Sequence, residues 1–105
     1  MRRSYHYEGS RDEAKRRLET AMELQAERYP RWEPTYRWVE PYRVRARFRI
    51  PVLDIEQVAT MMVWPDRVDV HLPLPRLLNT FRDRISAVLD KHARIILDGM
   101  LRDSA

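Results

Sequence analysis

Four arginines stand at every second position of one short stretch of the sequence. They are Arg43, Arg45, Arg47 and Arg49, and apolar residues lie between them. Because side chains of an extended strand point alternately to opposite faces, this spacing places all four guanidinium groups on one side. Guanidinium groups make planar contacts with carboxylates, phosphates and aromatic rings. These four residues, here named the arginine row, therefore predict a surface that binds an anionic partner.

Two further side chains, Met62 and Trp64, are expected beside the arginine row. A two-residue loop at Pro65-Asp66 would pair Trp64 with Arg67 and Val63 with Val68. The outer face of this hairpin would then hold Thr60, Met62, Trp64, Arg67, Asp69 and His71. The alternative is a solvated face, on which the arginines pair with Asp54, Glu56 and Asp69 and stack on Trp64. The sequence leaves both interpretations open.

No set of side chains in the sequence suggests catalysis. The chain has no cysteine and only two glycines, which excludes a thiol nucleophile, a cysteine zinc site and a glycine-rich phosphate loop. Its three histidines, His6, His71 and His92, fall in separate predicted elements, so they form no metal-binding pair. His92 stands on an apolar helix stripe, which is typical of a core or boundary histidine. We expect a protein that is not an enzyme and needs no metal or cofactor.

The length and charge of the chain restrict its class. Its 105 residues are enough for one domain, which we place at 1–105 with short tails at 1–9 and 102–105. The net charge of +4 permits an acidic partner, although dedicated nucleic-acid binders are usually more basic. No apolar run approaches the roughly 18 residues of a membrane span, and residues 1–7 lack the apolar segment of a secretory signal. We therefore expect a cytoplasmic protein.

Two amphipathic helices are predicted. Ser10 and Glu13 form a capping box at the start of a helix over about residues 11–28, and Pro30 ends it. A second helix is predicted over about 75–101, because apolar residues recur there at helical spacing. Its end is more apolar than one buried stripe requires. The excess predicts a possible oligomer contact, formed by Ile95, Leu97, Met100 and Leu101.

Three or four strands are predicted between the two helices. The clearest is 42–50, followed by 58–64 and 67–72, and a short strand at 35–39 lies between prolines that confine it to a sheet edge. Trp32, Tyr36 and Trp38 surround that short strand, where they either seal the core or line a binding groove. The predicted fold class is α+β, with both helices on one face of an antiparallel sheet and the other face open.

Several segments together resemble a known family. They are Ser10 to Lys15, Tyr36-Arg37-Trp38, the alternating strand that ends near Phe48, Val68 to Pro73, Leu77-Leu78 and Phe81 to Ile85. Over about residues 4–90 the chain is similar to the polyhydroxyalkanoic acid system family, small bacterial proteins encoded beside genes for polyester storage granules. The resemblance implies a cytoplasmic protein linked to storage granules. It brings no catalytic residues.

Three functions follow as hypotheses. The first is an accessory protein that docks a protein partner or the granule surface through the arginine row, Met62 and Trp64, or through its last helix. The second is a nucleic-acid-binding module, since basic and aromatic side chains on an open sheet are typical of single-strand platforms. The third is a self-associating structural domain, for example a homodimer.

Overall fold

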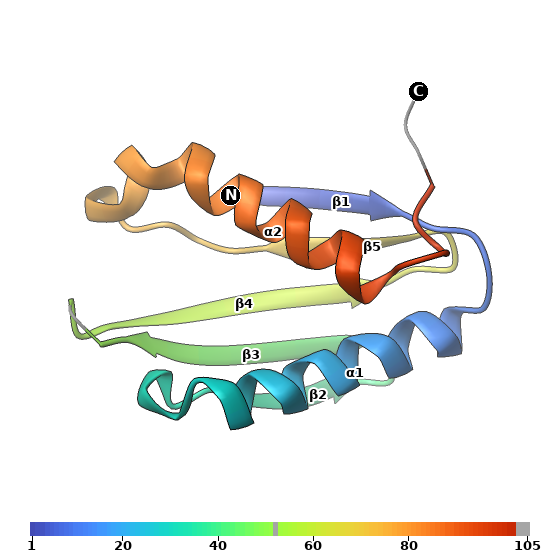
Figure 1. The fold of residues 1–105 in the computed structure, drawn as a ribbon, viewed down its shortest axis with the longest axis horizontal. Coiled ribbons are helices and arrows are strands. Elements are labelled where there is room, and N and C mark those ends of the chain that lie inside the picture. The colour runs from blue at the N-terminus through green and yellow to red at the C-terminus, as the bar shows by residue number, and fades with distance from the viewer. Residues whose placement is uncertain (52, 103–105) are drawn as a thin grey trace.

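The computed structural model describes residues 1–51 and 53–102, and these form one sheet with two helices on one side (Figure 1). The strands are β1 (Arg2–His6), β2 (Thr35–Glu40), β3 (Arg43–Ile50), β4 (Ile55–Val63) and β5 (Arg67–His71). The helices are α1 (Arg11–Arg28) and α2 (Arg82–Ile96), and short 3-10 helices cover Pro30–Trp32 and Arg76–Phe81. The α+β class and the layering predicted from the sequence are thus confirmed, with five strands in place of three or four.

All neighbouring strands in the sheet are antiparallel, in the order β1-β5-β4-β3-β2. Helix α1 lies over the β3 and β2 side of the sheet, and α2 lies over the β1 and β5 side (Figure 1). Within the described part of the chain, neither helix combines the length and apolar character needed to cross a lipid bilayer. The sheet face opposite the helices, here named the open face, is not covered by either of them.

The register of the β4–β5 hairpin is the one that the sequence predicts. Val63 stands opposite Val68, Met61 stands opposite Val70, and the backbone N–H of Trp64 donates to the carbonyl of Arg67 at 2.7 Å. This register turns Val63 and Val68 toward the helices, where both are buried. A shift of one residue would expose these apolar groups, so burial specifies the pairing.

The first residues of the chain form a strand, which corrects the predicted tail over 1–9. β1 pairs with β5 along its whole length, with Arg3 opposite Val70 and Tyr5 opposite Val68. Arg3 and Tyr5 therefore face the helices, whereas Arg2, Ser4 and His6 face the open side. The sequence signal was weak because β1 has no aliphatic residue and pairs with a strand more than sixty positions away.

The C-terminal part of the chain also differs from the prediction. The predicted helix over 75–101 is a 3-10 helix followed by α2, which ends at Ile96. Gly99 then adopts a φ of +78°, a left-handed conformation that glycine accepts without strain and that turns the chain back. Leu101 consequently forms a β-bridge with Tyr7, and the N–H of Arg102 donates to the carbonyl of His6 at 2.8 Å. Arg102 is thus paired with the sheet, and 103–105 lie outside the described residues.

The core lies between the helices and the inner side of the sheet. Its buried members come from α1, from three strands, from the residue after β1 and from the C-terminal turn after α2: Tyr7, Ala14, Leu18, Val44, Val63, Val68, Val70, Leu97 and Met100. Tyr36 and Trp38 of β2 pack against this cluster, and Trp32 lies against Phe48 with ring centroids 5.9 Å apart. Tyr36 and Trp38 thus seal the β2 edge of the core, which is the first of the two roles considered for them.

Candidate partner-binding face of the sheet

β3 places the arginine row on the open face. Val44 is fully buried beneath α1, so the residues that alternate with it, Arg43 and Arg45, must point away from the helices. Arg45 and Arg47 are exposed, and Arg43 and Arg49 are partly covered by their neighbours. β3 is therefore an extended strand, as the sequence predicts, and its four guanidinium groups lie on the face that the helices do not cover.

Three members of the arginine row have carboxylate neighbours. Arg43 lies 3.4 Å from Glu40 and Arg47 lies 3.6 Å from Glu56. Arg49 donates to Asp54 at 2.9 Å, and this hydrogen bond raises the pKa of the Arg49 guanidinium above its usual value. Exposed pairs of this kind contribute little to stability, because water and salt screen them. They hold the side chains in place weakly enough for a partner to exchange with them.

Arg45 has a different neighbour. The residue directly opposite it on β2 is Arg37, whose side chain shares the open face. Within residues 1–51 and 53–102, neither guanidinium has a carboxylate within ion-pair distance. The alternative of a solvated face, on which the arginines pair with carboxylates, therefore holds for Arg43, Arg47 and Arg49 but not for Arg45 within these residues.

Met62 and Trp64 lie on the open face as predicted. Met62 stands between Arg43 on β3 and Asp69 on β5. The indole N–H of Trp64 donates to Asp69 at 2.9 Å, and the guanidinium of Arg67 lies 5.3 Å from the ring centroid. Trp64 is thus already engaged by the protein at one end of the face.

Asp69 organises that end of the face. Besides Trp64 it accepts hydrogen bonds from Ser4 at 2.7 Å and from Arg67 at 3.3 Å. His71, the next residue along β5 on the same face, stands opposite Thr60 on β4 and Arg2 on β1.

The five strands together give the open face a small excess of positive charge. The register places seven arginines there, Arg2, Arg37, Arg43, Arg45, Arg47, Arg49 and Arg67, with the three carboxylates Glu40, Glu56 and Asp69. Three further carboxylates beside the strands, Glu33, Asp54 and Asp66, also lie within ion-pair distance of these arginines. Sequence reasoning missed Arg2 and Arg37 as members of this face. The signal for Arg37 was present, because it alternates with Tyr36 and Trp38 in the predicted edge strand.

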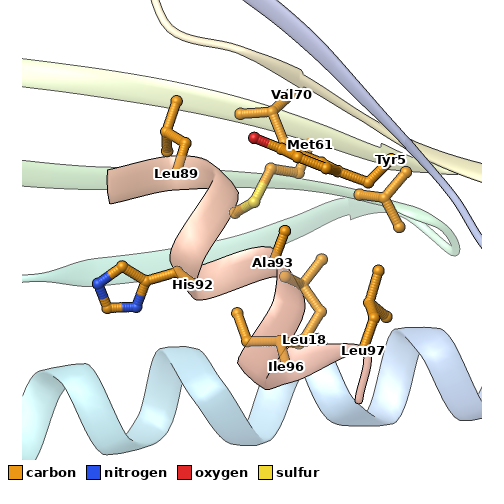
Figure 2. A pocket seen from close by; sticks show the side chains of 10 residues that line it. Tyr5, Leu18, Met61, Val70, Leu89, His92, Ala93, Ile96 and Leu97 are labelled. Atoms are coloured by element: carbon orange, nitrogen blue, oxygen red, sulfur yellow. The ribbon is translucent and has the colours of Figure 1, made fainter. Parts of the chain in front are cut away.

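A second feature is a small cavity between the two helices and the sheet (Figure 2). It measures about 90 Å³, and its lining is apolar except for Tyr5 and His92. The Tyr5 hydroxyl donates to Asp90 at 2.7 Å, and burial raises the pKa of Tyr5 to about 12. His92 is half-buried at the rim, as predicted for a boundary histidine. The described residues contain no cluster of three potential metal ligands.

The four residues predicted as an oligomer contact do not share one surface. Leu97 and Met100 are buried in the core at 3% and 8% exposure, so the expectation that they face a partner is wrong. Leu101 is partly covered by its bridge to Tyr7, and Ile95 alone is largely exposed, at 63%. The chain reverses at Gly99, and this turn carries the last apolar residues back into the core.

Comparison with known protein families decides the relationship that the sequence suggested. Residues 5–97 match the family model described as "Putative polyhydroxyalkanoic acid system protein". The chain belongs to this family. No curated protein and no solved structure matches it.

Membership of the polyhydroxyalkanoic acid system family confirms the resemblance seen in the sequence. The matched range begins at Tyr5, near the end of β1, and ends at Leu97, so it covers β2 to β5 and both helices in full. The arginine row therefore lies within the family's domain, whereas the first three residues of β1 precede the matched range. The match assigns no residue a role, and the function of the open face has to be argued from its chemistry.

Proposed function

We propose that this protein is a non-enzymatic accessory factor of the polyhydroxyalkanoic acid system, which docks an acidic protein partner through its open face. The observation that carries the proposal is the uncovered arginine row of β3, flanked by Arg37 and Arg67. Arg37 and Arg45 have no carboxylate within 4.0 Å among residues 1–51 and 53–102, which makes this part of the face complementary to a surface rich in Asp and Glu. Arginine is also the charged residue that protein interfaces favour.

The chemistry of the face favours a protein over bare polyester. A surface that adheres directly to an apolar polymer needs a contiguous exposed apolar patch. On the open face the apolar groups Val58 and Met62 are partly buried and lie among arginines. Guanidinium groups pressed against an apolar polyester would lose their hydration without forming new hydrogen bonds or ion pairs, which is unfavourable. The proposed partner is therefore a protein of the granule coat or of the polymer machinery.

Nucleic acid is less well supported as the ligand. Single-strand platforms present free aromatic rings on which bases stack. Trp64 lies at the end of the open face, its ring is approached by Arg67 and its indole N–H is bound to Asp69. The net charge of +4 is also small for this class of protein.

Co-sedimentation with purified granules tests the proposal. The chain is mixed with native granules, which carry their protein coat, and with granules stripped of protein by protease. We expect binding to native granules only, with an affinity that falls as salt rises, because exposed charge pairs are screened. Binding to stripped granules equal to that on native ones would overturn the proposed partner class.

A matched pair of charge reversals locates the contact. Arg45→Glu alters the open face, whereas Arg16→Glu makes the same charge change on α1, where the Arg16 side chain is 74% exposed. We expect Arg45→Glu to weaken binding to native granules by about tenfold or more, equivalent to about 1.4 kcal/mol, and Arg16→Glu to leave it nearly unchanged. Equal loss in both variants would mean that the whole-protein charge, not the open face, drives binding.

Self-association is a second candidate, supported by α2 and by Phe81, the residue directly before it. Phe81, Val88 and Ile95 are 46%, 53% and 63% exposed and recur every seven residues, a spacing at which helices pair. A second copy packing on this stripe would bury all three. Light scattering over a hundredfold range of concentration measures the molecular mass of the wild type and of Val88→Glu. We expect the wild type to form a dimer and Val88→Glu to remain a monomer. A strictly monomeric wild type at the highest concentration would refute self-association.

A further inference from the structure

Arg37 and Arg45 form the least expected pair in the sheet. They are direct neighbours across the β2–β3 pairing, so both guanidinium groups project from the same face at the same level. Like charges placed directly opposite each other on a sheet are destabilising. Arg47 follows at the next position on the same face, opposite Thr35, and adds a third positive charge.

The surrounding residues do not neutralise this pair. Arg43, Arg47 and Arg49 each have a carboxylate within 4.0 Å, namely Glu40, Glu56 and Asp54, respectively. Nothing comparable approaches Arg37 or Arg45 in residues 1–51 and 53–102. Three of the four arginines of the row are therefore paired with carboxylates, and Arg45 with Arg37 opposite it keeps its positive charge uncompensated among these residues.

A hollow lies at the same place. It is an open depression of about 280 Å³, lined by Thr35, Tyr36, Arg37, Val39, Arg45 and Arg47. Three guanidinium groups and the Thr35 hydroxyl supply donors, and Val39 supplies an apolar edge. Planar donors of this kind bind a carboxylate through two parallel hydrogen bonds.

We propose that Arg37, Arg45 and Arg47 form a carboxylate-binding site, which receives Asp or Glu side chains of an acidic peptide segment of the partner. The inference rests on the proposed function and names the anchor point within the open face. The repulsion between Arg37 and Arg45 lowers the stability of the unliganded fold. A bound carboxylate offsets this repulsion and so stabilises the fold.

Thermal unfolding with and without ligand tests the site on the intact chain. The probes are sodium glutarate, a free dicarboxylate, and a hexaglutamate peptide, each compared with sodium chloride at equal ionic strength. We expect both probes to raise the melting temperature of the wild type, and the peptide to act at a lower concentration because several carboxylates engage the face together. A response to glutarate without a response to the peptide would overturn a peptide segment as the ligand.

Two variants with the same charge change separate this site from general electrostatics. Arg37→Glu places a negative group opposite Arg45, and Arg49→Glu reverses a guanidinium that already has Asp54 as its partner. Without ligand we expect Arg37→Glu to raise the melting temperature by about 1–5 °C, and Arg49→Glu to lower it or leave it unchanged. With glutarate, only Arg37→Glu should lose the ligand-dependent rise.

The outcomes distinguish the site from the docking function. A fall in melting temperature in Arg37→Glu, or an equal glutarate response in wild type and Arg37→Glu, would overturn the site. If Arg37→Glu and Arg49→Glu then weakened granule binding equally, docking would stand without this anchor. If the wild type bound glutarate and peptide but no native granules, the site would stand and the proposed function would fall.

Discussion

Arg3 and Asp90 are joined by a bidentate contact although they stand 87 positions apart in the sequence. Nη2 of Arg3 lies 2.7 Å from both carboxylate oxygens of Asp90, and the Tyr5 hydroxyl donates to one of them at 2.7 Å. This contact fastens β1, the first edge of the sheet, to α2 above it. The edge strand that carries Arg2 on the open face is thus held from the opposite side of the sheet.

Removing the charge of Asp90 should loosen this attachment. We expect Asp90→Asn to lower the free energy of unfolding by about 1–2 kcal/mol, because the partly exposed Arg3 loses an ionic acceptor and regains only part of that energy from water. Urea unfolding followed by circular dichroism measures the difference. Asp83→Asn, also on α2, is the matched control, and a loss there as large as in Asp90→Asn would contradict this role.

The same contact predicts how stability depends on acidity. Hydrogen bonds from Arg3 and then from Tyr5 lower the pKa of Asp90 below its ordinary value. The unfolded chain therefore binds this proton more readily, and stability rises with pH across the interval between the folded and unfolded pKa values. We expect the contribution to be complete above about pH 5 and lost as the pH falls through the lowered pKa. A melting curve of Asp90→Asn that shows the same acid dependence as the wild type would refute the assignment.

Tyr5 should titrate at unusually high pH. Its pKa is raised to about 12, first by burial and then by the hydrogen bond to Asp90. Because the neutral form is favoured in the folded chain, this group stabilises the fold below its unfolded pKa, and that contribution is lost as the pH rises toward 12. Ultraviolet titration of the wild type and Tyr5→Phe identifies the transition. A wild-type spectrum without a tyrosine titrating above the ordinary range would contradict it.

The parts of the fold that local pattern determines were predictable from the sequence. Strict alternation from Arg43 to Ile50 located β3, and Pro65-Asp66 located the hairpin together with its register. Ser10 and Glu13 located the start of α1, where the Ser10 hydroxyl accepts from the Glu13 N–H at 3.3 Å. In each case neighbours along the chain provide the decisive contacts.

The parts that depend on distant contacts were not predictable in this way. β1 is a strand because β5 pairs with it and because Asp90 binds Arg3 and Tyr5. The position of Arg45 opposite Arg37 likewise depends on the pairing of β2 with β3, and the sequence does not specify which residues of these two strands stand opposite each other. The sequence therefore predicts the arginine row, which depends on alternation along one strand. It does not predict the cross-strand neighbours of the row, which depend on how distant segments pair.

Two apolar residues near the end of α2 differ sharply in burial, and the cost of truncating each can be compared. Leu97 is 3% exposed and Ile95 is 63% exposed, although the two stand only two positions apart. We expect Leu97→Ala to lower the free energy of unfolding by about 2–4 kcal/mol and Ile95→Ala to change it by less than about 0.5 kcal/mol. Chemical denaturation measures both. Similar costs for the two substitutions would contradict the placement of Leu97 in the core and of Ile95 on the surface.

Arginine footprinting on native granules tests the central proposal most directly. The chain is treated with phenylglyoxal, free or bound to granules, and modification at each arginine is read by mass spectrometry. We expect Arg37 and Arg45 on the open face to be protected in the bound sample, while Arg16 on α1 reacts equally in both. Protection of Arg16 with Arg37 and Arg45 still reactive would show that the helical side faces the granule, and would contradict the account.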